Sequence, residues 1–305
     1  MATKIVLPGN FKGNLALILD GTNLLHRSYH GMRGSDLRSG GKPVWGLHGF
    51  GSTLNRLITE VRPVKIITAF DLPGGAPQRR LVAPEYKGNR SKPDEDLRYQ
   101  LQECLALCSE AGLGATTAEG WEADDVIASA VKVGRELGYF SAVVSSDRDC
   151  YQLISDTSIV IKPEGVIYDK EKLMNEVGVT PEGYRHLAAL RGEPSDNLLG
   201  VNGIGVKTAA KLLSVYLDPD LMLRERDKVE VLIGRAAAAK LFNGFDIYRR
   251  NLEVGELKSD LPVKDSFNSV IDAKRVADAF MSYGLSSVSQ KLSKSISSLG
   301  SKGLF

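Results

Sequence analysis

Short apolar runs alternate with amphipathic segments over the first half of the chain. Four runs have the length and β-branched content of buried strands, at residues 15–19, 64–70, 141–144 and 158–161. Between them, apolar residues recur every three or four positions, which predicts helices at 44–61, 96–111 and 122–137. Strands that alternate with helices are typical of a mainly parallel sheet covered on both faces, so we expect an α/β fold.

The pattern changes after about residue 180. Strand-like runs fade there, and a helical spacing of apolar residues recurs at 181–190, 207–216 and 273–283. We therefore expect a smaller α-helical module after the α/β domain. The last residues, 287–305, are rich in Ser and Lys, which is typical of a flexible tail.

Composition narrows the class of protein only a little. Hydrophobic residues make up 43% of the 305 and charged residues 25%, which argues against a disordered chain or a disulfide scaffold. No window approaches the length of about eighteen apolar residues that spans a membrane, and residues 1–15 lack the apolar core of a signal peptide. We expect a cytoplasmic protein with no membrane partner, associated with the nucleoid if it is bacterial. Cys104, Cys108 and Cys150 form no disulfide or zinc pattern and are expected to be buried.

Charge is distributed unevenly along the chain. The net charge of +2 is too small to indicate nucleic-acid binding by itself. Residues 79–92, however, hold five cations and one anion, and acidic residues gather at 119–125. The sequence therefore predicts a basic arm and a separate acidic pocket.

Carboxylates follow three of the predicted strands. Asp20, Asp71 and Asp147 lie at or just after the ends of the first three strands. The carboxyl ends of strands form the ligand crevice of an open parallel sheet, so these side chains should converge. Four more acids are expected in the same crevice: Glu122, Asp124, Asp125 and Asp149. So many like charges raise one another's pKa values unless divalent ions neutralise them.

All of these candidate ligands are oxygen atoms, which favours Mg²⁺ or Mn²⁺ over zinc. Any one acid alone is better explained as a helix cap or a surface carboxylate, and it is their number at one edge that favours a metal site. Two ions about 4 Å apart can activate water and stabilise both the attacking and the leaving oxygen of a phosphoryl displacement. The predicted substrate is a phosphodiester. The histidines show no ligand spacing: His26, His30, His48 and His186.

Two other phosphate-handling motifs are excluded by their spacing. The Asp-Gly-Thr tripeptide at 20–22 resembles the end of the DxDGT phosphatase motif, but the position of the nucleophilic Asp is Ile18. The glycines of 200–205 resemble those of a P-loop, but the Lys that should stand at 206 is Lys207, and no apolar strand precedes them.

A glycine turn in the second half offers a phosphate contact. Gly203, Ile204 and Gly205 precede a helix expected to start near Lys207, so backbone N–H groups and the helix N-terminus can approach a phosphate. Lys207 and Lys211 would add positive charge one turn apart. A plain connection between two helices gives the same pattern, so the turn alone decides little.

Six motifs occur in the order found in bacterial and phage 5′ nucleases, the flap endonuclease family. They are LDGTN at 19–23, FD at 70–71, YKGNR at 86–90, EADD at 122–125, SDRD at 146–149, and SDN through GIGVKTA at 195–209. From about residue 15 to about residue 285 the chain resembles these enzymes. It is similar to a stand-alone version of the 5′-3′ exonuclease domain of bacterial DNA polymerase I, since no polymerase module follows.

The resemblance implies a division of the chain into two regions and a tail. A PIN-like α/β nuclease domain with a central, mainly parallel sheet is expected at 1–185, including a basic helical arch at about 72–98. A helix-three-turn-helix region that binds duplex DNA is expected at 186–286, followed by the flexible tail at 287–305.

The resemblance also assigns metal ligands. They are Asp20, Asp71, Glu122, Asp124, Asp125, Asp147, Asp149, Glu193 and Asp196. By position the first five form one metal group and Asp147, Asp149 and Asp196 the second, with Asp125 or Asp147 near both. Where the family usually has Gly-Asp, this chain has Gly192 and Glu193, whose carboxylate is one methylene longer. We expect altered occupancy of the second metal rather than its loss.

Tyr86, Lys87 and Arg90 match the arch of the family, where the Lys and Arg contact the scissile phosphate and the Tyr stacks on a base. A solvated basic loop is the alternative for this segment. The implied catalytic residues are Lys87, Arg90, Asp125 and Asp147. The implied DNA contacts are Arg79, Arg80, Tyr86, Lys87, Arg90, Gly203, Ile204, Gly205, Lys207, Thr208 and Lys211. In the family the hairpin also binds K⁺, so the same ion is expected there.

The expected function is that of a structure-specific 5′ nuclease, both flap endonuclease and 5′-3′ exonuclease, acting in DNA replication and repair. It would hydrolyse DNA phosphodiesters by two-metal-ion catalysis, with two or three Mg²⁺ or Mn²⁺ ions, and leave 5′-phosphate and 3′-hydroxyl. The expected partner is DNA with a 5′ flap or a single-stranded 5′ end at a duplex junction, bound by a monomer. The alternatives are a non-catalytic junction-binding protein, whose carboxylates should be missing, and a PIN-type RNase, which would not need the hairpin.

Overall fold

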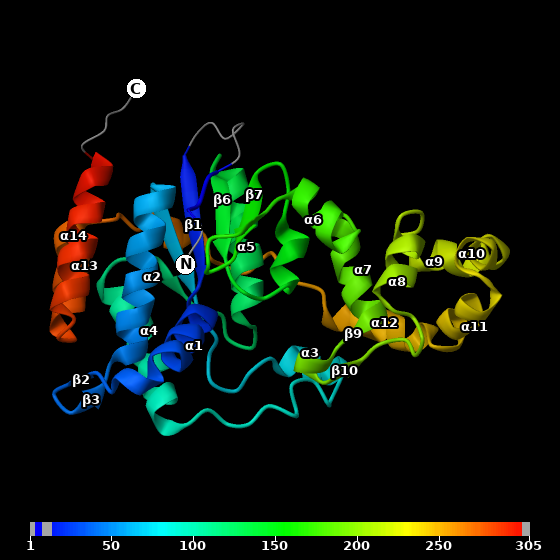
Figure 1. Cartoon of the computed structure of the whole chain (residues 1–305), viewed down its shortest axis with the longest axis horizontal. Helices are drawn as coiled ribbons and strands as arrows, with labels where there is room; N and C mark the ends of the chain where they lie inside the picture. Colours follow the sequence, from blue (N-terminus) through cyan, green and yellow to red (C-terminus); the bar gives the residue numbers. More distant parts are fainter. Residues whose placement is uncertain (1–3, 8–13, 301–305) are drawn as a thin grey trace.

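A six-stranded sheet lies at the centre of the larger lobe (Figure 1). The computed structural model describes residues 4–7 and 14–300. The strand order is β5-β4-β1-β6-β7-β8, in which the first five strands are parallel and β8 is antiparallel to β7. The strands are β1 (Leu15–Asp20), β4 (Lys65–Ala69), β5 (Ala115–Thr116), β6 (Phe140–Val144), β7 (Ser158–Ile161) and β8 (Ile167–Tyr168). The predicted α/β fold with a mainly parallel sheet is confirmed.

Helices cover both faces of this sheet. The odd-numbered residues of β1 pack with one group of helices, whereas Ala16 and Ile18 pack with α5 on the other face. Every residue of β1 is buried, which is why its sequence is a continuous apolar run rather than an alternating one. The helices concerned are α1 (Gly21–Met32), α2 (Trp45–Val61) and α4 (Glu95–Glu110) on the first face and α5 (Ala123–Glu136) on the second.

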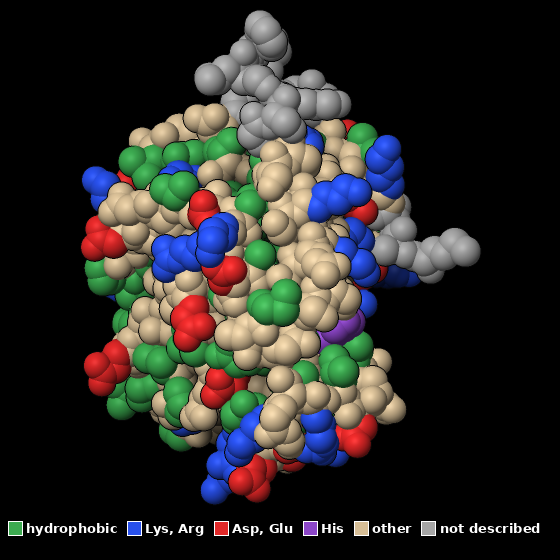
Figure 2. Space-filling view, turned by 90° about the vertical axis from the view of Figure 1, so that its left-hand side faces the viewer, with side chains coloured by type: hydrophobic (Ala, Val, Ile, Leu, Met, Phe, Trp, Pro, Cys, Tyr) green, Lys and Arg blue, Asp and Glu red, His purple; other side chains and the backbone are tan. Residues whose placement is uncertain are grey.

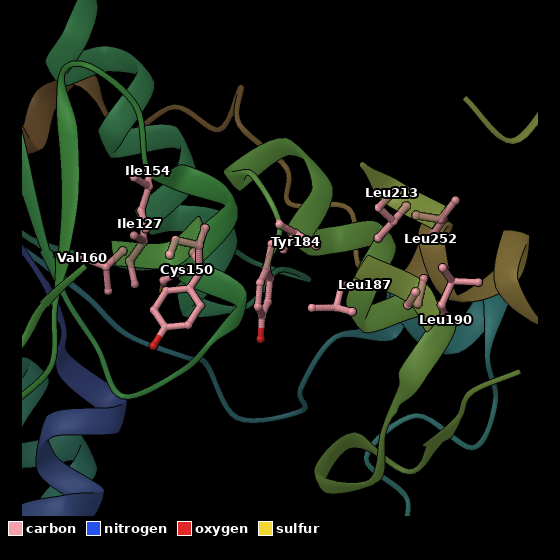
Figure 3. Packing of buried hydrophobic residues seen from close by; sticks show 14 of the residues in the cluster. Ile127, Cys150, Ile154, Val160, Tyr184, Leu187, Leu190, Leu213 and Leu252 are labelled. Carbon is pink, nitrogen blue, oxygen red and sulfur yellow. The ribbon is translucent and has the colours of Figure 1, made fainter. Parts of the chain in front are cut away.

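A smaller helical lobe follows the sheet. Its core is continuous with that of the sheet, because Cys150, Tyr184 and Leu187 fill the space between Val160 of β7 and Leu252 (Figure 3). This shared core holds the smaller lobe in a fixed position at one end of the sheet. The helices from β8 to the end of this lobe are α6 (Lys170–Val177), α7 (Pro181–Arg191), α8 (Val206–Leu213), α9 (Pro219–Arg224), α10 (Arg226–Ile233), α11 (Arg235–Asn243) and α12 (Phe245–Val254). Between α7 and α8 lie β9 (Gly192–Glu193), the 3-10 helix η3 (Pro194–Asp196) and β10 (Leu198–Leu199).

The C-terminal segment differs from its prediction. After α12 the chain returns to the larger lobe through η4 (Lys264–Asn268), α13 (Ala273–Ser282) and α14 (Ser286–Gly300), and α14 packs against α2 and α13 (Figure 1). The predicted flexible tail is wrong for 287–300, because Val288, Leu292 and Ile296 are buried on one face of α14. Residues 301–305 lie outside the described part of the chain. Side chains of both charge signs are interspersed with small hydrophobic patches over this side of the molecule (Figure 2).

The segment predicted as a helical arch is helical only in part. Between α3 (Pro77–Val82) and the start of α4, residues 83–94 form turns and extended chain, and we call them the strap. Pro84, Gly88 and Pro93 account for the lack of a helix there. Short elements complete the lobe: η1 (Arg33–Ser35), β2 (Arg38–Ser39), β3 (Lys42–Pro43) and η2 (Asp149–Leu153). Among the described residues, the helices are too short or too polar to cross a membrane.

Candidate active site

Six aspartates gather at the carboxyl edge of the sheet. Four parts of the larger lobe supply five of them, namely the end of β1, the end of β4, the segment after β6 and the first turn of α5, and η3 of the smaller lobe adds the sixth. Asp124, Asp149 and Asp196 line one cavity, and Asp147 lines the next one with Asp149 and Asp196. Ser145 connects Asp20 to Asp147, and Asp71 accepts from the N–H of Ala123, the residue before Asp124. We call the six aspartates the acidic cluster: Asp20, Asp71, Asp124, Asp147, Asp149 and Asp196. The ends of β1, β4 and β6 lie side by side, so Asp20, Asp71 and Asp147 stand at one edge of the sheet, as expected for parallel strands.

Burial and mutual repulsion raise the pKa values of three cluster carboxyls. The pKa of Asp20 rises to about 7, mainly because the side chain is buried and further because of the charges on Asp71 and Asp147. Burial raises the pKa of Asp149 to about 7 and that of Asp124 well above its ordinary value, with Asp147 the next cause in both cases. A cation among these oxygens would stabilise the ionised forms and oppose the shifts.

Hydrogen bonds fix the orientation of the cluster. The Ser145 hydroxyl donates to Oδ2 of Asp20 at 2.7 Å and accepts from the backbone N–H of Asp147 at 2.9 Å. The N–H of Asn23 donates to Oδ1 of Asp20, and the N–H of Asp149 to Oδ1 of Asp147, both at 2.9 Å. Sequence reasoning missed the role of Ser145, although a buried serine directly after the apolar strand β6 was a usable signal.

The strap closes over the cluster through Glu122. Lys87 Nζ lies 2.5 Å from Oε1 of Glu122, and the Tyr86 hydroxyl donates to Oε2 at 2.8 Å. Lys87 therefore reaches the acidic edge, whereas its predicted contact with the scissile phosphate stays a prediction. The prediction that Tyr86 stacks on a base is not met in this arrangement, because the side chain is only 4% exposed and its hydroxyl is engaged.

Asp125 is not part of the acidic cluster. Its side chain is fully buried and receives two hydrogen bonds from Arg79, at 2.7 and 2.9 Å, and two more from the backbone N–H groups of Glu122 and Lys258. Both oxygens are thus engaged, so the predictions of Asp125 as a metal ligand and catalytic residue are wrong for this structure. The predicted DNA contact at Arg79 is wrong as well, because Arg79 is buried and neutralises Asp125.

The other predicted residues of this region lie near the surface. Arg90 contacts Asp196, with NH2 2.6 Å from Oδ1, and Arg80 is exposed. Glu193 is paired with Arg191 and lines the same cavity as Asp149 and Asp196.

The cluster has the chemistry of a divalent-metal site but is not closed around one point. Within 4–7 and 14–300, no three His, Cys, Asp or Glu side chains converge tightly enough to enclose an ion. The donors are nonetheless all carboxylate oxygens, the ligands that Mg²⁺ and Mn²⁺ prefer, and burial followed by mutual repulsion disfavours the ionised forms of Asp20 and Asp149 unless a cation is bound. The cluster residues therefore fit Mg²⁺ or Mn²⁺. Asp196 also pairs with Arg90, but that arginine is half-exposed, whereas Glu122 and Asp125 are buried against Arg79.

The glycine turn of the smaller lobe exposes its backbone and two lysines. Gly203, Gly205, Lys207 and Lys211 are exposed and Thr208 is half-buried, at the start of α8.

Two side chains at this turn differ from the predicted set of DNA contacts. Ile204 is only 4% exposed and packs in the core, so its side chain is unavailable for the predicted DNA contact. Lys240 of α11 crosses directly over Gly203, where a Cβ would lie 2.7 Å from the Lys240 Cδ. Sequence reasoning missed this third lysine.

Comparisons with known proteins cover most of the chain. The family model for the 5′-3′ exonuclease N-terminal resolvase-like domain matches residues 15–178, and that for the 5′-3′ exonuclease C-terminal SAM fold matches 179–278. The thermostable DNA polymerase I of Thermus thermophilus is 34% identical over 249 residues, which are 81% of this chain and 29% of that protein. DNA polymerase I of Mycobacterium tuberculosis is 33% identical over 253 residues, which are 81% of this chain and 27% of that protein. The chain thus spans less than a third of the length of these curated relatives.

Solved structures share the fold. The T5 5′-exonuclease with bound zinc ions has a TM-score of 0.66 at 24% identity, over 94% of this chain and 99% of that one. The catalytic core of Rad2 in complex with a DNA substrate has a TM-score of 0.55 at 16% identity, over 94% of this chain and 92% of that one.

Proposed function

This chain belongs to the 5′-3′ exonuclease family, and from that premise we propose that it is a structure-specific 5′ nuclease. It hydrolyses DNA phosphodiesters at 5′ flaps and junctions, and at free 5′ ends, leaving 5′-phosphate and 3′-hydroxyl. The observation that carries the proposal is the acidic cluster, where carboxylates from both lobes meet beneath a strap that bears Lys87 and Arg90.

The proposed cofactors are Mg²⁺ or Mn²⁺, held by the six aspartates of the acidic cluster. When bound, such ions neutralise the carboxylates and supply activation of water and stabilisation of the leaving oxygen. The T5 enzyme has been solved with bound divalent ions, which supports the assignment. A K⁺ ion at the turn 203–208 and a monomeric state are further parts of the proposal.

The strap supplies the positive charge for the phosphate. Lys87 and Arg90 are held at the cluster by Glu122 and Asp196, so both cations already lie where negative charge develops on a phosphoryl group. A phosphate that reaches the cluster competes with these two carboxylates for the cations. Lys87→Ala should therefore slow the chemical step by about 10²–10³-fold in single-turnover kinetics.

The smaller lobe supplies contacts to duplex DNA. Lys207, Lys211 and Lys240 surround the exposed turn at 203–208, where backbone N–H groups and the start of α8 favour a phosphate. These contacts read the DNA backbone and not the base sequence, which suits an enzyme that recognises the shape of a junction.

Product mapping tests the proposal directly. A 5′-flap duplex, a blunt duplex and an intact single strand are each incubated with Mg²⁺, with Mn²⁺ and with EDTA, and Asp147→Asn is the control variant. Metal-dependent cuts at the flap junction that the variant cannot make are expected. Tight binding with no cutting under either metal would instead favour a junction-binding protein, and a variant as active as the parent would refute the metal assignment.

A further inference from the structure

The loop after β6 carries two of the six cluster aspartates and needs its own support. Residues 145–148 form no regular secondary structure and Asp149 is the first residue of η2, yet Asp147 and Asp149 must both face the cluster. Two supports come from the cluster side: the Ser145 hydroxyl bonded to Asp20, and Asn23 Oδ1, which accepts from the N–H and the hydroxyl of Ser146 at 3.1 and 2.7 Å.

A third support comes from behind the loop. Lys162, the residue after β7, is only 9% exposed, and its Nζ donates to the carbonyl oxygens of Ser146 at 2.9 Å and Asp147 at 3.2 Å. The ammonium group also lies 4.5 Å from the ring centroid of Tyr151 and 6.0 Å from that of Tyr168. Lys162 is thus a buried cation beside a packed pair of aromatic rings, whose centroids lie 4.6 Å apart, and its hydrogen bonds go to the backbone of the acid-bearing loop.

These contacts have a clear physical consequence. The two carbonyls are partly buried, and a carbonyl shielded from water without a donor is unfavourable, so they keep the loop backbone turned toward Lys162. The aromatic rings hold the ammonium group in place by cation–π attraction. The carbonyl and the side chain of Asp147 are attached to the same Cα. Holding the carbonyl on the Lys162 side therefore restricts the side chain to directions that face the cluster.

We propose that Lys162 is a positioning residue, whose ammonium group fixes the loop 145–149 so that Asp147 and Asp149 present their carboxylates together. The assignment rests on the proposed function, since it concerns the same acidic cluster. Lys162 touches neither substrate nor cluster carboxylates; it acts through the loop backbone.

The test compares Lys162→Met with Lys65→Met, using Mn²⁺ alone as the probe. Lys65 makes a similar bond, from Nζ to the carbonyl of Ser269 at 2.8 Å, but it starts β4 at the opposite edge of the sheet. Calorimetric titration gives the Mn²⁺ affinity, and hydrogen exchange without metal reports on the peptide 144–153. Partners that orient metal ligands typically change affinity by about 10–100-fold when removed, so this loss is expected for Lys162→Met. Lys162→Arg, which keeps the cation and its donors, should recover most of it.

The outcomes distinguish a failure of the positioning role of Lys162 from a failure of the proposed nuclease function. Weakened Mn²⁺ binding and faster exchange of 144–153 in Lys162→Met, with neither in Lys65→Met, support the positioning role. An unchanged affinity in Lys162→Met, or an equal loss in Lys65→Met, overturns it and leaves the nuclease proposal standing. Absence of Mn²⁺ binding by the unaltered protein overturns both. If Lys162→Met does not fold, Lys162→Gln is measured in its place, with the same deciding outcomes.

Discussion

Replacing Arg79 should destabilise the fold far more than replacing its neighbour Arg80. Both arginines stand in the same basic segment, and the resemblance to 5′ nucleases implies that both contact DNA. In the structure Arg79 makes two hydrogen bonds to the fully buried Asp125 and one, of 3.0 Å, to the carbonyl of Val254. The side chain of Arg80 is exposed and donates to the carbonyl of Gly74.

The magnitude follows from the charge that Arg79→Met leaves behind. Removing one partner of a buried ion pair costs about 3–5 kcal/mol, because the remaining charge is uncompensated. Asp125 keeps two backbone donors, from Glu122 and Lys258, so the lower end of that range is expected. A loss of about 3 kcal/mol is a large part of the typical stability of about 5–15 kcal/mol. For Arg80→Met the change should be within about 0.5 kcal/mol, as for surface residues in general.

Urea denaturation followed by circular dichroism measures the difference as a shift in midpoint. Asp125→Asn removes the buried charge and retains an acceptor, so the double variant Arg79→Met/Asp125→Asn should recover part of the loss. Arg80→Met should weaken DNA binding while leaving the free energy of unfolding nearly unchanged. If Arg79→Met is no less stable than Arg80→Met, or if Asp125→Asn recovers nothing, Arg79 does not neutralise Asp125, and the exclusion of Asp125 from the metal site is refuted.

Three further predictions concern other parts of the fold. Arg250→Glu breaks the 2.8 Å ion pair with Glu85 and should speed tryptic cleavage within the strap, and a second change, Glu85→Arg, should restore the protection. Burial lowers the pKa of His186 to about 4. Below about pH 6.5 the unfolded chain therefore binds a proton at His186 that the folded chain does not bind, so the free energy of unfolding falls as the pH drops toward 4. This contribution, up to about 3 kcal/mol, should vanish in His186→Gln when urea midpoints are compared at pH 7 and pH 4.5. Leu292→Ala should cost about 2–5 kcal/mol because the side chain is fully buried in α14, whereas a flexible tail would show no change in thermal unfolding.

Much of the larger lobe could be predicted because its signals are local. The apolar run before Asp20 is buried on both faces, and the run itself places the acid at the carboxyl edge of the sheet. The same reasoning located Asp71 and Asp147. Once three strands end at one edge, the convergence of their following residues is a property of parallel sheets.

The different roles of Asp124 and Asp125 could not be predicted in this way. They are adjacent in the first turn of α5 and have the same side chain. The partners that separate them come from elsewhere in the chain: Arg79 lies 46 residues before Asp125, and Lys258 lies 133 residues after it. Only the packing of α3 and of the segment after α12 decides which aspartate is neutralised and which faces the cluster.

The C-terminal helix shows a signal that composition concealed. Ser and Lys dominate residues 286–300, and this content predicted a flexible tail. Val288, Leu292 and Ile296 are spaced four residues apart, however, which is the periodicity of one helix face. Periodicity indicates what can pack, whereas composition indicates only average polarity, so the spacing was the better guide here.

The energetic cost of opening the strap is concentrated at Lys87. The side chains of Arg250 and Glu85 are 34% and 40% exposed, and pairs of this kind contribute no more than about 1 kcal/mol. Those of Lys87 and Glu122 are 16% and 8% exposed, so separating them leaves two charges where water compensates poorly. A phosphate at the cluster would give Lys87 a new anionic partner when Lys87 leaves Glu122. This new contact would offset most of the free energy needed to separate Lys87 from Glu122. The strap is therefore expected to stay closed in the free protein and to open where a phosphate is offered, and this makes Lys87 the residue that links substrate entry to the acidic cluster.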